Sequence, residues 1–173
     1  MELVDTANAA ANAQLLLNEF RKQSLPVIHV QHISVRKGAT FFLPGTKGVE
    51  IHEMVEPKQG ENLIIKSYPN SFRDTSLLEN LINNRIKDLV ICGAMSHMCI
   101  DATTRAAFDL GFNCVVVEDA CATRDLIFKG KSIEASVVHA SFMAALSVLY
   151  AQVFTTRETL IEMANSRLLQ RST

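Results

Sequence analysis

The chain has 173 residues, of which 48% are hydrophobic, and this is enough for one well-packed domain but not for two. Its 17 basic and 18 acidic residues give a net charge of −1 without a basic tract, which argues against nucleic acid and anionic membranes as partners. No apolar run has transmembrane length, and the N-terminus has no basic-then-apolar leader pattern. We therefore expect a cytoplasmic protein that acts on a small molecule.

The first predicted element is a helix over residues 1–23, with Asp5 and Thr6 as possible cap residues. Its apolar stripe comprises Ala9, Ala13, Leu16, Leu17 and Phe20. A buried strand over residues 25–32 follows, with Pro26 at its start, where a missing N–H is tolerated, and His32 at its carboxyl end.

Residues 33–60 hold four of the seven glycines and two of the four prolines and show no sustained period. A loop of this length in a compact domain is usually functional. A strand over residues 62–66 comes next and ends at Lys66, and a helix is predicted from about residue 75 to residue 84. If the sheet is parallel, Lys66 emerges at the same edge as the ends of the other strands, although an ordinary solvated lysine is the alternative.

The most informative stretch is residues 88–107, where a short apolar strand leads through Gly93 into a helix that carries Cys99 near its N-terminus. Helical spacing of Ala102, Ala106, Ala107 and Leu110 supports the helix, and Gly111 suits its end. A helix N-terminus favours a thiolate, and its N–H groups can stabilise an oxyanion. The alternative is a buried structural thiol.

The remaining elements are a buried strand over residues 113–118, a helix over 132–150, a strand over 152–155 and a closing helix. Ile133, Val137, Ala144 and Val148 are expected on one side of the long helix, and Thr155 with Glu158 forms a candidate capping box. From residue 165 onward we expect a polar, frayed tail.

The other three cysteines have a simpler interpretation, because the spacings of the four fit no zinc motif and a chain of this size needs no disulfide. Cys92 and Cys114 lie in apolar strand runs and are interpreted as small core residues. Cys121 follows a strand end, and its role stays open.

Alternating strands and helices predict a single α/β domain over residues 1–173, with three layers (α/β/α) and a mostly parallel sheet. Ligands bind such folds outside the carboxyl ends of the strands, where His32, Lys66 and Cys99 are all expected. No Gly-x-Gly-x-x-Gly follows a predicted strand, so a dinucleotide-binding domain is excluded.

Four segments, residues 25–30, 66–72, 93–107 and 111–120, make the chain resemble the isochorismatase-like cysteine hydrolases, a group that includes nicotinamidases and carbamoylsarcosine amidohydrolase. The resemblance extends from about residue 6 to residue 160. It implies that Cys99 is the nucleophile and Lys66 its cationic partner. It also implies a cis peptide bond between Ala94 and Met95 that aims a backbone N–H into an oxyanion hole, and a homo-oligomer.

The chain departs from this family in one respect. The family's basic aspartate lies on an apolar-apolar-Asp-x-Gln strand that precedes the first helix, and this sequence has no such strand. Asp5 borders the helix directly, so we do not assign it this role. Three explanations remain open: an N-terminally shortened enzyme, a gap that a partner chain fills, or a family fold without catalysis.

The resemblance also bears on metal and pocket residues. The nicotinamidase metal motif of Asp-x-His plus a later His is not matched by the segment from His29 to His32, so we expect no metal and no cofactor. His32, Phe41, Phe42 and Phe72 are candidate pocket residues, and His32 could equally be structural. We expect a metal-independent cysteine hydrolase that cleaves a small amide through a thioester. The alternatives are a catalytically silent, oligomeric interaction protein and, within the family, vinyl ether hydrolysis.

Overall fold

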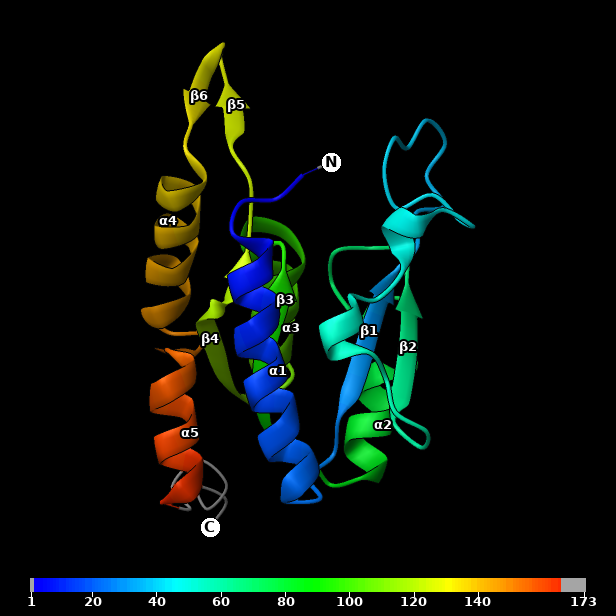
Figure 1. Ribbon diagram of the computed structural model, residues 1–173, viewed down its shortest axis with the longest axis vertical. Coiled ribbons are helices and arrows are strands. Elements are labelled where there is room, and N and C mark those ends of the chain that lie inside the picture. The colour runs from blue at the N-terminus through cyan, green and yellow to red at the C-terminus, as the bar shows by residue number, and fades with distance from the viewer. Residues whose placement is uncertain (1, 166–173) are drawn as a thin grey trace.

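The computed structural model describes residues 2–165, so the expected frayed tail lies almost entirely outside the described residues. Strands and helices alternate along the chain, and the predicted α/β fold is confirmed (Figure 1). No helix in the described part of the chain is long and apolar enough to cross a membrane.

The parallel sheet is divided into two parts. The first part pairs β1 (Ile28–His32) with β2 (Asn62–Lys66) in parallel. The second part has the order β3-β4-β7 and is also parallel; its strands are β3 (Asp88–Ala94), β4 (Asn113–Ala122) and β7 (Gln152–Phe154). Within residues 2–165, β1 pairs only with β2, and β3 pairs only with β4. Residues of β1 and β3 line a common opening between the two parts of the sheet.

Helices cover both faces of the second part of the sheet. On one face lie α1 (Thr6–Lys22) and α5 (Thr156–Ala164), which also contact each other (Figure 1). The other face is covered by α3 (Asp101–Asp109) and α4 (Ala135–Ser147), while α2 (Leu77–Asn83) packs beneath the first part. The result is the three-layer arrangement that the sequence predicts.

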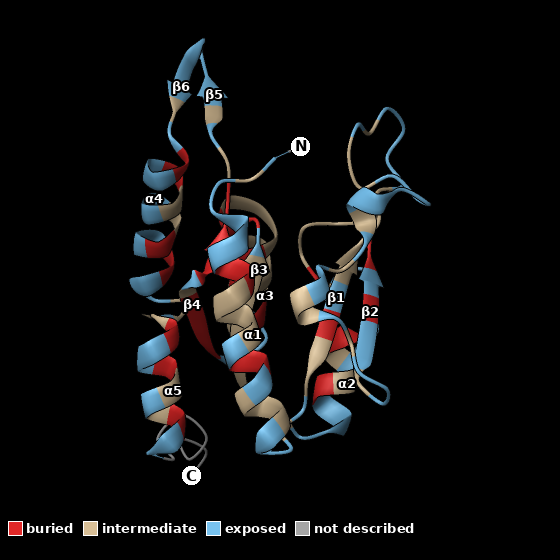
Figure 2. Cartoon of the chain, in the orientation of Figure 1, coloured by how far each residue is buried: buried red, intermediate tan, exposed pale blue. Residues whose placement is uncertain are grey.

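The central strand β4 explains these layers, because successive side chains of a strand point to opposite faces. Val115 and Val117 pack against Leu16 of α1, whereas Val116 packs against Leu146 of α4. The strand is consequently buried along most of its length (Figure 2). The apolar run at residues 115–117 is thus explained by the helices that cover β4 on both faces.

The two helix caps that the sequence suggested behave differently. Asp5 occupies the N-cap position of α1, but its side chain makes no capping hydrogen bond and accepts one from the Asn8 side chain instead. Asp5 is therefore at the predicted cap position, but its side chain does not cap the helix. At α5 the Thr155–Glu158 capping box is confirmed, since the Glu158 N–H donates to Thr155 Oγ1 and the Thr155 N–H donates to Glu158 Oε2.

The predicted long helix over residues 132–150 begins later than expected. An antiparallel hairpin, β5 (Leu126–Phe128) with β6 (Lys131–Ile133), projects from the domain before α4 (Figure 1). Helix α4 starts at Ala135, whose N–H donates to the Asp125 carboxylate at 2.7 Å.

The apolar residues that the sequence places on one side of the long helix do not form its buried face, and α3 buries only part of its apolar spacing. In α4, Val137 is 53% exposed and Val148, directly after the helix, is 84% exposed, while Val138, Met143 and Leu146 are buried. In α3, Leu110 at the helix end is 47% exposed and Thr104 faces inward with Ala107. Both helices are rich in small and apolar residues on several sides, so periodicity alone does not identify the buried face.

Contacts on both faces join the two parts of the sheet. On the α1 face, Arg21 donates two hydrogen bonds to Glu61, at 2.7 and 2.8 Å, and Glu61 Oε2 also lies 2.8 Å from His29 Nε2. The Arg21 guanidinium, with the Lys58 N–H and His29, holds the pKa of Glu61 well below its ordinary value. On the opposite face, Ile64 of β2 packs with α2 and with Phe112.

Candidate active site

The carboxyl ends of the strands bring the predicted site residues to one edge. Register pairs His32 with Lys66 at the end of β1 and β2, and Ala94 ends β3. A cavity of about 270 Å³ opens here and is lined by both Lys66 and Cys99, together with Ala94 and Phe72. Lys66 and Cys99 therefore line the same cavity, although they come from different parts of the sheet.

The backbone before Cys99 has an uncommon conformation. Gly93 has φ +126°, a region that side chains rarely adopt, and the peptide bond between Ala94 and Met95 is cis, at the position that the family resemblance indicated. One turn of π-helix, η3 (Ser96–Ile100), follows and runs directly into α3. Cys99 thus lies in the π-turn before α3 and not in the first α-helical turn, and π-turns occur frequently at functional sites.

Two side-chain pairs anchor this turn to the rest of the fold. Ser96 is completely buried, and its Oγ lies 2.8 Å from His139 Nδ1 of α4. His97 Nδ1 forms a hydrogen bond with Thr123 Oγ1, just beyond β4. Burial lowers the pKa of both histidines, which favours their neutral forms. Sequence reasoning missed both anchors, because their partners lie 26 and 43 residues away.

Lys66 is held rigidly and is not a solvated lysine. Its side chain is 5% exposed, and Nζ donates to the carbonyl oxygens of Tyr68 and Pro69 at 3.0 and 2.7 Å. An ammonium has three N–H donors, so one remains without a partner among the described residues. Ser71 fixes this segment to α3, since its N–H donates to Thr103 Oγ1 at 3.1 Å.

The environments of the four cysteines differ. Burial raises the pKa of Cys92 and of Cys114 to about 11, and it raises that of Cys121 further. Cys114 and Cys121 are buried, which confirms Cys114 as a core residue and settles the open position of Cys121. Cys92 packs in the core but also lines the cavity. Cys99 is half-buried and lines the same cavity as Lys66.

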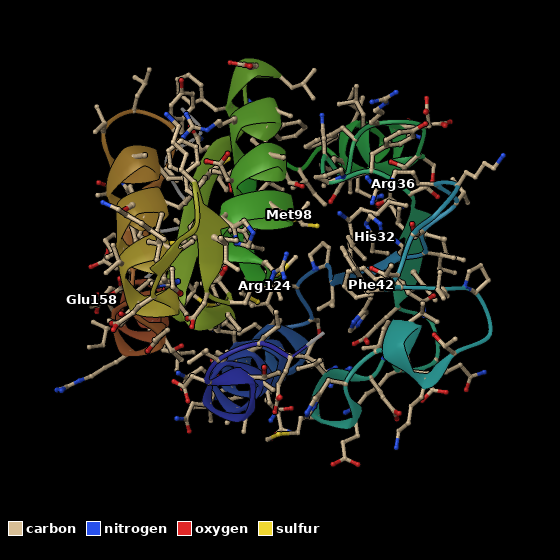
Figure 3. The ribbon with its side chains drawn as sticks, turned by 90° about the horizontal axis from the view of Figure 1, so that it is seen from above. His32, Arg36, Phe42, Met98, Arg124 and Glu158 are labelled. Atoms are coloured by element: carbon tan, nitrogen blue, oxygen red, sulfur yellow. The ribbon has the colours of Figure 1, made fainter. Side chains whose placement is uncertain are left out.

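The predicted aromatic pocket residues divide into two groups. Phe72 lines the 270 Å³ cavity and stacks on Phe112 with ring centroids 6.0 Å apart. Phe41 and Phe42 lie in the long loop, and neither of them lines that cavity. The ring of Phe42 packs against the ring of His32, with the ring centroids 5.2 Å apart. His32 and Phe42 are labelled in Figure 3. The Nδ1 atom of His32 is buried without a hydrogen-bond partner. Burial, and to a smaller extent the charge of Lys66, lowers the pKa of His32.

The cavity continues into the opening between β1 and β3. A second cavity of about 280 Å³ lies on the α1 side and shares Ile28, Val30, Val90, Cys92 and Gly93 with the first. Among residues 2–165, no aspartate or glutamate lines either cavity. Asp5 lies elsewhere, in a pocket beside Glu118 and His139, which agrees with its not being assigned as the base.

No three His, Cys, Asp or Glu side chains in residues 2–165 are grouped so that they could hold a metal ion. The absence of a metal from the reaction stays a prediction.

Comparison with known proteins adds four findings. The family model for the isochorismatase domain matches residues 2–156. The isochorismatase family protein YddQ of Bacillus subtilis is 52% identical over 156 residues, covering 90% of this chain and 87% of YddQ. A solved structure from Oleispira antarctica has a TM-score of 0.86 at 51% identity and covers 92% of this chain and 84% of that chain. Streptothricin hydrolase of Streptomyces noursei is 37% identical over 111 residues, which are 64% of this chain and 40% of that enzyme.

Proposed function

Because the chain belongs to the isochorismatase family of hydrolases, we propose that it hydrolyses a small amide with Cys99 as the nucleophile. The observation that carries this proposal is the cavity that Cys99 shares with Lys66. Amide chemistry is supported by relatives whose names describe amide hydrolysis, among them a nicotinamidase of Arabidopsis thaliana, 26% identical over 134 residues.

The proposed reaction has two steps. The Cys99 sulfur attacks the amide carbonyl carbon, the C–N bond breaks, and the thiol proton ends on the departing amine. Water then cleaves the thioester and returns the thiol. The Lys66 ammonium, whose third N–H is unpaired among the described residues, would stabilise the oxyanion electrostatically. The scheme needs no metal.

An acylation experiment tests the nucleophile without knowledge of the substrate. p-Nitrophenyl acetate has a good leaving group, so Cys99 should accept its acetyl group even when amide turnover is slow. We expect mass spectrometry to find one acetyl group on the Cys99 peptide. Cys99→Ala should abolish the labelling, whereas Cys114→Ala, a matched change in the core, should retain it. Acetylation that is absent, or equal in the Cys99→Ala variant, contradicts the proposal.

A panel of small amides then tests the reaction itself, with ammonia or amine release as the readout. We expect release from at least one amide and loss of that activity in Cys99→Ala. A protein that is acetylated at Cys99 but inert on every amide would contradict amide hydrolysis.

A second candidate is a catalytically silent interaction protein. Among residues 2–165, no carboxylate lines the 270 Å³ or the 280 Å³ cavity. This favours the silent protein, because the family resemblance implies an aspartate as the base of the reaction. This candidate requires a defined oligomer or a partner, so light scattering of the purified chain is the discriminating measurement. A monomer without a partner, or measurable amide turnover, rejects it.

A further inference from the structure

Thr103 is a polar residue of the cavity to which the proposed reaction gives no role. It lies on α3, four residues after Cys99, and both residues line the 270 Å³ cavity together with Lys66. Residues four positions apart lie on the same side of a helix. Thr103 is therefore about one helical turn away from the proposed nucleophile.

The Thr103 hydroxyl group attaches the segment after Lys66 to α3. Thr103 Oγ1 accepts a hydrogen bond from the Ser71 N–H at 3.1 Å and lies 2.9 Å from Ser71 Oγ. It also donates to the Pro69 carbonyl oxygen at 3.3 Å. In the described part of the chain, every hydrogen bond between residues 67–72 and α3 ends at this one hydroxyl group.

The Pro69 carbonyl oxygen connects this hydroxyl group to the Lys66 ammonium. It accepts a hydrogen bond from Lys66 Nζ at 2.7 Å, the shorter of the two bonds that hold the ammonium. A carbonyl oxygen has two lone pairs, so it can accept from Lys66 and Thr103 at the same time. The threonine hydroxyl group has one donor and two acceptor positions, and Pro69 and Ser71 use all three. A continuous network thus runs from the ammonium to the helix that follows Cys99.

We propose that Thr103 is a positioning residue that fixes the Lys66 ammonium relative to the Cys99 sulfur. This rests on the proposed amide hydrolysis. The oxyanion of that reaction forms on the carbonyl group that Cys99 attacks, and a cation stabilises it best when its position is fixed in advance. Lys66 and Cys99 come from different parts of the sheet, and the Thr103 hydroxyl group joins them through two hydrogen bonds in series.

The test measures how fast p-nitrophenyl acetate acetylates Cys99, with mass spectrometry as the readout. Thr103→Val keeps the shape of the side chain and removes the hydroxyl group, so the buried Ser71 N–H loses its acceptor. We expect the acetylation rate to fall about 10- to 100-fold, because displacing a catalytic group by about 1 Å has effects of this size. Thr103→Ser, which retains the hydroxyl group, should restore most of the rate.

Thr104→Val is the matched control, because it makes the same change one residue further along α3. Thr104 is completely buried, and its Oγ1 has no hydrogen-bond partner in the described residues. This substitution should leave the acetylation rate unchanged. An equal loss of rate in Thr104→Val would show that any disturbance of the helix slows the reaction, and it would overturn the proposal.

A double-mutant cycle separates the positioning of Lys66 from a merely structural role. Lys66→Met removes the ammonium, so it should slow acetylation, and adding Thr103→Val should then cause no further loss. A structural role of Thr103 would instead slow the reaction by the same factor in both backgrounds. If Thr103→Val does not fold, Thr103→Ala, which also lacks the hydroxyl group, takes its place.

The outcomes distinguish this proposal from the proposed function. A wild-type protein that is not acetylated at Cys99 overturns both. If the wild type is acetylated, an unchanged rate in Thr103→Val or in Lys66→Met overturns the positioning role alone. Independent losses that multiply in the double variant overturn it as well.

Discussion

Selective alkylation of Cys99 is the prediction that most directly tests the description of the site. Cys92 and Cys114 have pKa values raised to about 11 by burial, and only the thiolate reacts with iodoacetamide. At about pH 7.5 a thiol with that pKa is roughly 0.03% ionised, whereas an unperturbed thiol with a pKa of about 8.5 is roughly 9% ionised. Ionisation alone therefore slows the two buried thiols by about 300-fold relative to a free cysteine.

Cys99 differs from them because it is half-buried at the cavity that Lys66 also lines. We expect its labelling to exceed that of Cys92 and Cys114 by at least about 100-fold, since their low ionisation adds to poor access. Mass-spectrometric mapping of the four cysteine peptides over time, from about pH 6 to about pH 9, gives the individual rates.

Labelling of the urea-unfolded chain is the control, because all four thiols should then react at similar rates. The reasoning would be refuted if Cys92 or Cys114 of the folded protein reacted as fast as Cys99. It would equally be refuted if Cys99 were as slow as the buried thiols.

Three further predictions concern stability, each measured by urea unfolding. Glu61→Gln should lower the free energy of unfolding by about 3 kcal/mol because it leaves Arg21 without its anion, while the exposed Glu53→Gln changes little. The pKa of Glu61 is lower in the folded state than its unfolded-state value near 4.5. The contribution of Glu61 to the free energy of unfolding is therefore complete above that value and is lost as the pH falls below it. The free energies of unfolding of wild type and variant should consequently converge in acid. Leu146→Ala, at a completely buried position, should cost about 2–5 kcal/mol. Gly93→Ala should lower the free energy of unfolding by about 1–3 kcal/mol, because Gly93 has a φ of +126° that alanine rarely adopts. The same change should alter the rate at which iodoacetamide labels Cys99. If both the stability and the labelling rate stayed unchanged, the account of this turn would be contradicted.

The sequence predicts the order of elements well where a segment has one clear period. Residues 114–117 are apolar at every position, and strands covered on both sides require this pattern. The hairpin after β4 was missed because its strands have three residues each. A signal existed, since Lys129 and Gly130 both have positive φ as in a two-residue hairpin turn, but Lys-Gly is a weaker turn signal than Asn-Gly.

The site was predictable to the extent that strand ends determine it. Lys66 and Cys99 each follow the end of a strand, and parallel strands bring their carboxyl ends to one edge. The anchors of the Cys99 turn were not predictable, because the contact between Ser96 and His139 depends on how α4 packs on the sheet.

The division of the sheet has a consequence for how reactivity is controlled. Within one hydrogen-bonded ladder, backbone spacing fixes the distance between groups on neighbouring strands. Lys66 and Cys99 do not share a ladder, so their separation is set by side-chain contacts at a distance: the ion pair of Arg21 with Glu61 and the hydrogen bond from Ser71 to Thr103. Substitutions at these contacts shift the ammonium relative to the sulfur without altering either group. If the proposed reaction holds, its rate can therefore be adjusted through residues that line no part of the cavity.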